Sequence, residues 1–194
     1  AIVFALTLKI APPEMTNAFI GEATITQGIF TVERNAQKQT VHDHIQLLVG
    51  DTLSTPTGSE VSIRFIDDST SILFPETIIK IDSFLLNTPN IKNSLLALTL
   101  QKGEMHNDTN KQDGDLAKMQ IQTPTSLIEA KNSDFQVSVD TEGKTEVTAI
   151  TNAVTVKAFD PTKKMSKKII AQVQAVQGYK VTTGGKLQNT ASPL

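Results

Sequence analysis

Residues 48–81 constrain the fold more than any other part of the chain. Short apolar segments alternate there with polar turns, and the spacing is too tight for a helix of useful length. Val61, Ile63 and Phe65 share one parity and are separated by polar residues, which is the period of a half-buried strand. Turn-forming pairs such as Gly50-Asp51 separate these segments. The pattern therefore predicts consecutive short strands.

The same rhythm continues through the second half of the chain. Phe135, Val137 and Val139 alternate, and residues 140–144 have the composition of a hairpin turn. Residues 169–181 fit either a helical or a strand period, and strand is preferred because every neighbouring segment is strand. With about ten to twelve short strands and frequent turns, we predict an all-β domain. It is a twisted β-sandwich or a short β-solenoid-like domain.

The composition limits the function classes. A chain of 194 residues fits one domain, and 39% apolar residues supply a core. The absence of cysteine excludes disulfides, thiolate metal sites and cysteine catalysis. A net charge of −2 does not favour nucleic acid as a partner. One basic cluster is interpreted as a solvated loop or strand edge, with a contact to a membrane surface or an acidic partner as the alternative; it consists of Lys163, Lys164, Lys167 and Lys168.

The chain is expected to divide into three parts. Residues 1–13 contain an apolar run that ends at Pro12-Pro13, and they are interpreted as the end of a membrane or signal segment or as a linker. An ordinary strand is the alternative. Residues 14–183 form the β domain. Residues 184–194 are small and polar, and they are predicted to be a flexible tail.

Two segments have some ligand chemistry, but each has a simpler interpretation. His42-Asp43-His44 places two imidazoles on one face of a strand, yet zinc needs further ligands and only His106 remains, so a polar turn is preferred. Residues 107–116 partly match a calcium loop. Gln112 and Asp113 occupy a ligand and the glycine position, which makes a solvated loop the better interpretation.

The sequence contains no pattern typical of catalysis. Its carboxylates are numerous but unpatterned, and the adjacent Asp67 and Asp68 are suited to capping backbone amides in a turn. Nucleophile-elbow, zinc-protease and phosphate-loop motifs do not occur. We therefore predict a protein that is not an enzyme and needs no cofactor or metal.

The order and spacing of several short motifs between Gly28 and Lys157 resemble the FecR domain, found in bacterial iron-uptake regulators and surface proteins. Asp68, Asn132 and Asn152 stand where that family usually has glycine, and Asp and Asn are the residues that best tolerate the left-handed conformation. The residues that carry the resemblance in this sequence are Gly50, Asp51, Thr55, Asp67, Ser69, Pro75, Gly103, Thr123, Pro124, Phe135 and Val137.

The resemblance implies that these residues are structural and perform no chemistry. It also implies a periplasmic or extracellular sensor or scaffold that binds a protein partner, in transmembrane signalling of the anti-sigma type, with a single-pass membrane anchor before the fragment. We expect the partner to bind at an exposed strand edge. The alternatives are a structural cell-surface module and a carbohydrate-binding β domain. The sparse aromatic residues argue against the latter.

Overall fold

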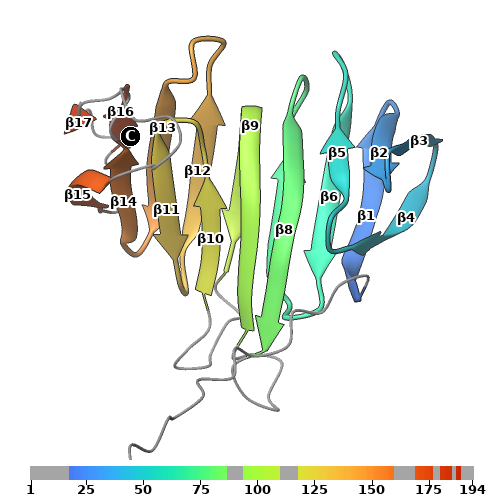
Figure 1. Cartoon of the computed structure of the whole chain (residues 1–194), viewed down its shortest axis with the longest axis horizontal. Coiled ribbons are helices and arrows are strands. Elements are labelled where there is room, and N and C mark those ends of the chain that lie inside the picture. The colour runs from blue at the N-terminus through green and yellow to red at the C-terminus, as the bar shows by residue number, and fades with distance from the viewer. Residues whose placement is uncertain are drawn as a thin grey trace, which may run out of the picture.

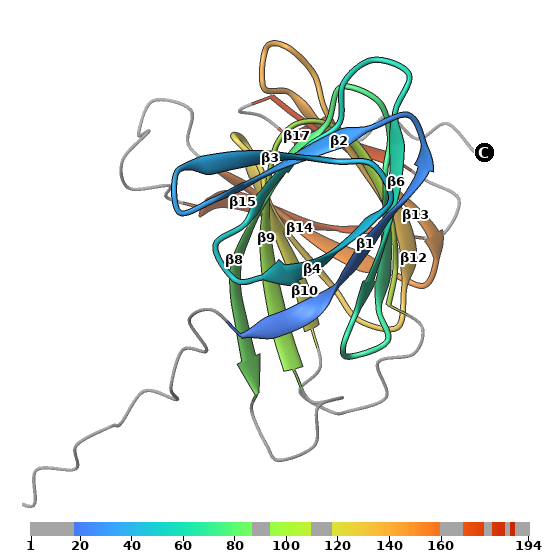
Figure 2. The ribbon, with the colours of Figure 1, turned by 90° about the vertical axis from the view of Figure 1, so that its right-hand side faces the viewer.

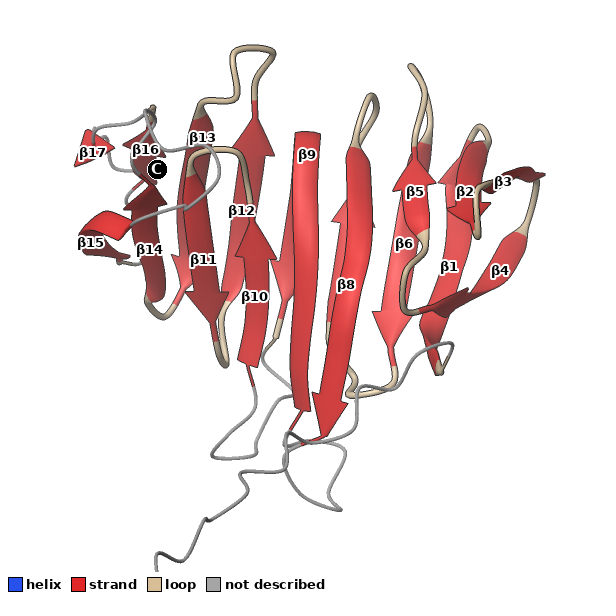
Figure 3. Ribbon diagram, viewed as in Figure 1, coloured by secondary structure: helices blue, strands red, loops and turns tan. Residues whose placement is uncertain are grey.

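The regular elements of the structure are all β-strands (Figure 3). The computed structural model describes residues 18–86, 94–109, 118–159, 169–176, 180–184 and 187–188. These residues form seventeen strands, which confirms the all-β prediction. The strands outnumber the ten to twelve expected because some turns are very short. Asn35 and Ala36 alone, both with positive φ, join the strands Phe30–Arg34 and Gln37–Val41.

The strands form two facing layers, named sheet A and sheet B (Figure 1). Sheet A contains, in spatial order, β4 (His44–Leu48), β1 (Phe19–Gln27), β6 (Glu60–Phe65), β7 (Thr70–Leu73), β9 (Ser94–Asp108), β12 (Asp134–Val139), β13 (Thr145–Thr151), β16 (Lys180–Thr183) and β17 (Leu187–Gln188). Sheet B contains β3 (Gln37–Val41), β2 (Phe30–Arg34), β5 (Thr52–Ser54), β8 (Ile78–Leu86), β9 again, β10 (Lys118–Gln122), β11 (Ser126–Ala130), β14 (Val154–Phe159) and β15 (Ile169–Ala175).

Strand β9 belongs to both sheets. Its residues 94–102 pair with β8, and part of this half also pairs in parallel with β10 in sheet B. Its residues 103–108 pair with β12, and part of this half also pairs with β7 in sheet A. The strand changes sheet at Gly103, whose φ of +91° is accessible to glycine at little cost. The two layers are therefore joined at the middle of the molecule (Figure 1).

The core lies between the two sheets and follows the predicted alternation. Val61, Ile63 and Phe65 are all buried, as are Phe135 and Val137 on the opposite half of sheet A. Fully burying one such side chain contributes about 1.5–3 kcal/mol, so this alternation is a main source of stability.

The left-handed conformations expected at three turn residues are present. Asp68 has φ of 66°, Asn132 of 48° and Asn152 of 58°. Each lies in the turn between two consecutive strands. The prediction that Asp and Asn would keep these turns intact is confirmed.

The polar segment that starts at Asn107 was wrongly predicted to be an exposed loop from its first residue. Asn107 lies within β9, is fully buried, and accepts a hydrogen bond from Ser71 Oγ at 2.8 Å. Thr109 is also buried and donates to the carbonyl of Ser133 at 3.0 Å. Both residues have the inward parity of Met105, and this parity decides their burial despite their polarity.

Several predicted segments lie outside the described residues. They are residues 1–13, the lysine cluster at 163–168 and residues 110–117 of the polar loop. Within the predicted tail, Leu187–Gln188 forms β17, paired with β16.

Replacement of Gly103 tests the crossing of β9. An added Cβ would lie 2.4 Å from both Cα and Oγ1 of Thr77, and the backbone would be strained in addition. We expect Gly103→Ala to lower the free energy of unfolding by more than about 3 kcal/mol, measured by urea denaturation. Gly58→Ala is the matched control, because φ is +72° there and nothing lies within 4 Å. It should cost only about 1 kcal/mol. Equal losses in the two variants would contradict a steric role for Gly103.

Candidate functional site

The crossing of β9 is held by a pair of buried threonines. Thr55 Oγ1 donates to the carbonyl of Phe74 at 2.7 Å and accepts the N–H of Thr77 at 3.0 Å. Thr77 Oγ1 in turn bridges both backbone groups of Glu104, at 3.0 Å to its carbonyl and 2.9 Å from its N–H. The structure therefore brings the predicted Thr55 beside Gly103, through a threonine that sequence analysis missed. The turn that precedes Thr77 in the sequence was the one feature that could have pointed to a structural role for this threonine.

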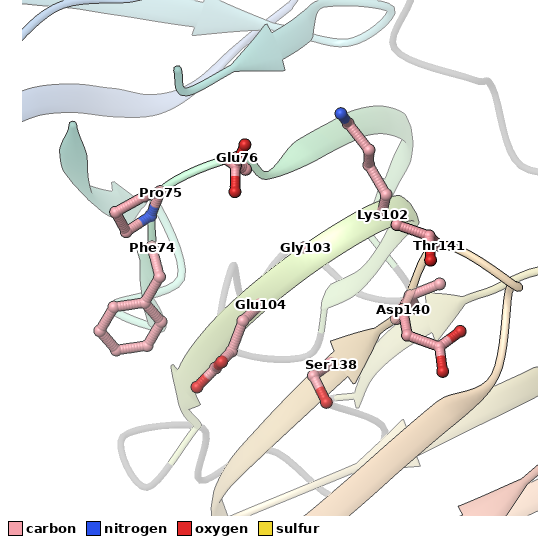
Figure 4. A pocket seen from close by; sticks show the side chains of 10 residues that line it. Phe74, Pro75, Glu76, Lys102, Gly103, Glu104, Ser138, Asp140 and Thr141 are labelled. Atoms are coloured by element: carbon pink, nitrogen blue, oxygen red, sulfur yellow. The ribbon is translucent and has the colours of Figure 1, made fainter. Parts of the chain in front are cut away.

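A cleft of about 470 Å³ opens beside this crossing (Figure 4). Three segments contribute its walls, namely the turn from β7 to β8, the middle of β9, and the hairpin between β12 and β13. The predicted Pro75 and Gly103 both line it. The remaining lining residues are Phe74, Glu76, Lys102, Glu104, Ser138, Val139, Asp140 and Thr141.

The carboxylates of this cleft already accept hydrogen bonds from the protein. Glu104 accepts from Gln136, and Asp140 accepts the N–H groups of Glu142 and Lys144, each at 2.9 Å. Asp140 thereby stabilises the hairpin turn that the sequence predicted. These carboxylates shape the backbone, and the cleft offers a recess at the rim of sheet A.

The predicted Asp51 forms a buried ion pair with Arg34 at one end of the sandwich. Arg34 Nε and Nη2 donate to the two carboxylate oxygens of Asp51, both at 2.7 Å. Asp51 is fully buried, whereas about a third of the Arg34 side chain is exposed. The hydrogen bond to Asp51 raises the pKa of Arg34 further above its ordinary value, against the opposing effect of burial. A bidentate contact between a guanidinium and a carboxylate is both strong and directional.

This ion pair closes the edge of sheet A. Arg34 Nη2 also donates to the carbonyl of Gln46 at 2.8 Å, and Asp51 accepts the N–H of Leu48 at 2.9 Å. Both groups belong to β4, which in the described part of the chain pairs only with β1. The pair thus occupies backbone groups that an edge strand otherwise leaves open. Sequence analysis missed Arg34, although it shares the inward parity of Phe30 and Val32.

The predicted Asp67 and Ser69 form a second buried polar group. Asp67 Oδ1 accepts the N–H of Ser69 at 3.0 Å and its hydroxyl at 2.6 Å, and Oδ2 accepts the hydroxyl of Ser94 at 2.9 Å. All three residues are buried. Asp67 therefore ties the β6–β7 turn to the start of β9.

The predicted Thr123 belongs to a cluster of hydroxyl groups in the second half of the sandwich. Thr123 Oγ1 lies 2.7 Å from Thr145 Oγ1, and Thr125 Oγ1 lies 2.8 Å from the same atom. Ser126 and Thr183 are hydrogen-bonded beside them. Pro124 is exposed at the adjacent turn.

The predicted Gly50 lies in the first half of the sandwich, where its φ is +95°. It turns the chain between β4 and β5, and its N–H donates to the carbonyl of Ile81 at 2.8 Å.

Glu129 is the centre of an ionic cluster on the outer face of sheet B. It accepts hydrogen bonds from Lys157, from Lys118 at 3.0 Å and from Gln120 at 2.8 Å. Burial raises the pKa of Glu129, but these three hydrogen bonds outweigh burial and lower it from 4.5 to about 2. The cluster ties β10, β11 and β14 together, and sequence analysis gave no indication of it.

The three histidines are not brought together. His42 and His44 lie around the exposed β3–β4 turn, where His44 Nδ1 lies 2.9 Å from Asp43. His106 lies on β9 and is hydrogen-bonded to Asp134. In the ranges that the structure describes, no group of three or more His, Asp or Glu side chains is arranged to hold a metal ion.

One family model matches the sequence, and two solved structures share the fold. The family model described as "FecR protein" matches residues 51–155. The fold resembles two crystal structures, at 1.65 and 2.50 Å resolution, of a candidate anti-sigma factor from Parabacteroides distasonis, with TM-scores of 0.56 and 0.55 and 10% identity. Each alignment covers 73% of this chain and 60% of that protein. No curated protein matches the sequence. Among the described residues, no helix has the length and apolarity needed to cross a membrane.

Replacement of Asp51 tests the edge-closing ion pair. Asp51→Ala removes the carboxylate that accepts hydrogen bonds from the Arg34 guanidinium and from the Leu48 N–H. We expect a loss of about 3 kcal/mol in the free energy of unfolding. Arg64→Ala is the control, since its ion pair with Asp68 is largely exposed, and it should change stability by less than about 0.5 kcal/mol. A loss at Asp51 no larger than at Arg64 would contradict the role assigned to the pair.

The Glu129 cluster predicts a pH dependence of stability. Because the folded pKa is lowered, the contribution of Glu129 is fully present above about pH 5 and is lost as the pH falls towards 2. The difference in unfolding free energy between wild type and Glu129→Gln should shrink by an amount of the order of 3 kcal/mol between pH 6 and pH 2. Glu33→Gln, at the exposed pair with Lys38, is the control. A constant difference across this range would show that Glu129 is not held ionised.

Proposed function

The chain belongs to the FecR protein family, and from that premise we propose that it is the extracytoplasmic sensor or scaffold domain of a signalling regulator and binds a protein partner. The observation that carries this proposal is the family match itself, which spans the crossing of β9 and more than half of the chain. The two structural neighbours are described as a candidate anti-sigma factor, and this supports the proposal of a regulatory role.

The roles of the motif residues support a non-enzymatic function. Asp51, Asp67 and Thr55 are buried, and their polar atoms form hydrogen bonds with backbone groups and neighbouring side chains. Gly103 and Gly50 serve the backbone alone. Residues of this kind build a rigid scaffold, and function then depends on the surfaces that the scaffold presents.

The anti-sigma role and the location are the finer parts of the proposal. The alignment covers 60% of the length of the similar anti-sigma candidates, so an activity of their whole length comes to this chain only as a proposal. We propose that the domain lies outside the cytoplasmic membrane, joined to a membrane anchor, and that partner binding alters the activity of a sigma factor inside the cell.

Protease accessibility and transcript profiling test this function. An epitope-tagged copy of the parent gene should yield a domain that external protease digests in spheroplasts, while a cytoplasmic marker stays intact. Deletion of residues 18–188 should change transcripts from the promoters of one sigma factor. Protection of the tag inside spheroplasts would exclude the proposed location. Accessible protein with unchanged transcripts would instead favour a structural cell-surface module.

A further inference from the structure

We propose that the free edge of β3 binds an extended segment of the partner as an added strand, and that a hollow beside β3 takes one apolar side chain of that segment. The inference rests on the proposed function, because it names the surface at which that partner binds. The end of the sandwich formed by β1, β2, β3 and β4 faces the viewer in Figure 2.

The geometry of the β2–β3 hairpin determines which backbone groups are free. A two-residue turn joins the strands, and Arg34 pairs directly with Gln37. In such a hairpin the pair that flanks the turn exchanges both hydrogen bonds, and the bonded pairs then alternate along the strands. The N–H and C=O groups of Lys38 and Thr40 therefore point away from β2.

The edge of β3 has little of the usual protection, with a single lysine and no other guarding feature in the described strand. It contains no proline, its register with β2 is continuous, and residues 37–40 are all exposed. Among the described strands it pairs only with β2. Its one charge is Lys38, which lies 3.7 Å from Glu33 of β2. By contrast, Arg34 and Asp51 close the neighbouring edge of sheet A. The two edges at this end thus differ, and β3 is the one left open to strand addition.

A hollow of about 200 Å³ lies directly beside this edge. Val32 and Ile45 provide apolar walls, and Gln37 and Gln39 of β3 line the hollow as well. Val32 is buried and Ile45 packs against the core, so the hollow reaches the margin of the hydrophobic interior. In strand addition, main-chain hydrogen bonds supply affinity and pockets for alternate side chains supply specificity. Both parts of that arrangement are present here.

The lining of the hollow specifies the chemistry of the segment. Its charged residues are Arg34 and Lys38, and the carboxylates paired with them, Asp51 and Glu33, lie outside the lining. A basic side chain facing inward would meet these like charges. The partner segment is therefore an extended, neutral or acidic stretch with an apolar side chain at the position that faces the hollow.

Selection from a phage-displayed library of random ten-residue peptides tests the proposal, with the full chain as bait. We expect selected peptides to be neutral or acidic with an apolar centre. Lys38→Pro and Thr40→Pro each remove an outward N–H without breaking a β2–β3 hydrogen bond, and each should weaken binding at least about tenfold. Lys38→Ala and Thr40→Ala keep the backbone and are the matched controls. They should bind nearly as well as wild type.

Amide hydrogen exchange gives a second measurement that needs no variant. A selected peptide should slow exchange at Lys38 and Thr40, and leave the exposed turn at Gly58 unchanged. The proposal is overturned if no peptide is selected, if the selected peptides are basic, or if they bind without protecting these two amides. It is also overturned if β3 instead pairs with a second copy, seen as a dimer in sedimentation that Lys38→Pro dissociates.

The two proposals fail in distinguishable ways. If peptides bind β3 but the domain is protected from external protease, the proposed location falls and the binding edge stands. If the domain is accessible and its deletion alters transcripts, but β3 binds no peptide, only the assignment of the edge falls.

Discussion

Strand β9 is shared by two sheets, and the rest of the sandwich depends on that sharing. Its first half pairs with β8 and β10, and its second half with β7 and β12. The crossing requires a residue with positive φ and no side chain at the point of closest approach to Thr77, and Gly103 supplies both. The cleft of Figure 4 and the paired threonines are consequences of this one crossing.

Buried polar groups stabilise the two sheets at other places. Asp67 fixes a turn to the start of β9, whereas Arg34 and Asp51 close one end of sheet A. In each case a carboxylate is buried because several donors converge on it, which offsets the cost of removing it from water. The motif residues therefore mark the places where this backbone needs support.

Local periodicity made most of the fold predictable, and long-range contacts explain what was missed. The burial of Val61, Ile63 and Phe65 follows from alternation within a few residues. The pairing of Arg34 with Asp51 joins β2 to the turn before β5, which meet only after folding, so no local signal names the partner. Asn107 was misjudged because composition alone was weighed across a polar run, whereas the inward parity of its strand decided its burial. The contact of Lys157 with Glu129 joins β14 to β11, which are not consecutive strands, so no local rule provides it.

A sandwich whose two sheets are joined at a central strand can vary in the number of strands at its two ends. Both sheets continue outward from β9 and finish in strands that pair on one side within the described chain. Strands gained or lost at either end would leave Gly103 and its threonines undisturbed. Such an architecture allows related proteins to diverge in size and in the surface of their ends while the middle stays constant. Selection on new partners would then act chiefly at the ends, where the fold is most tolerant of change.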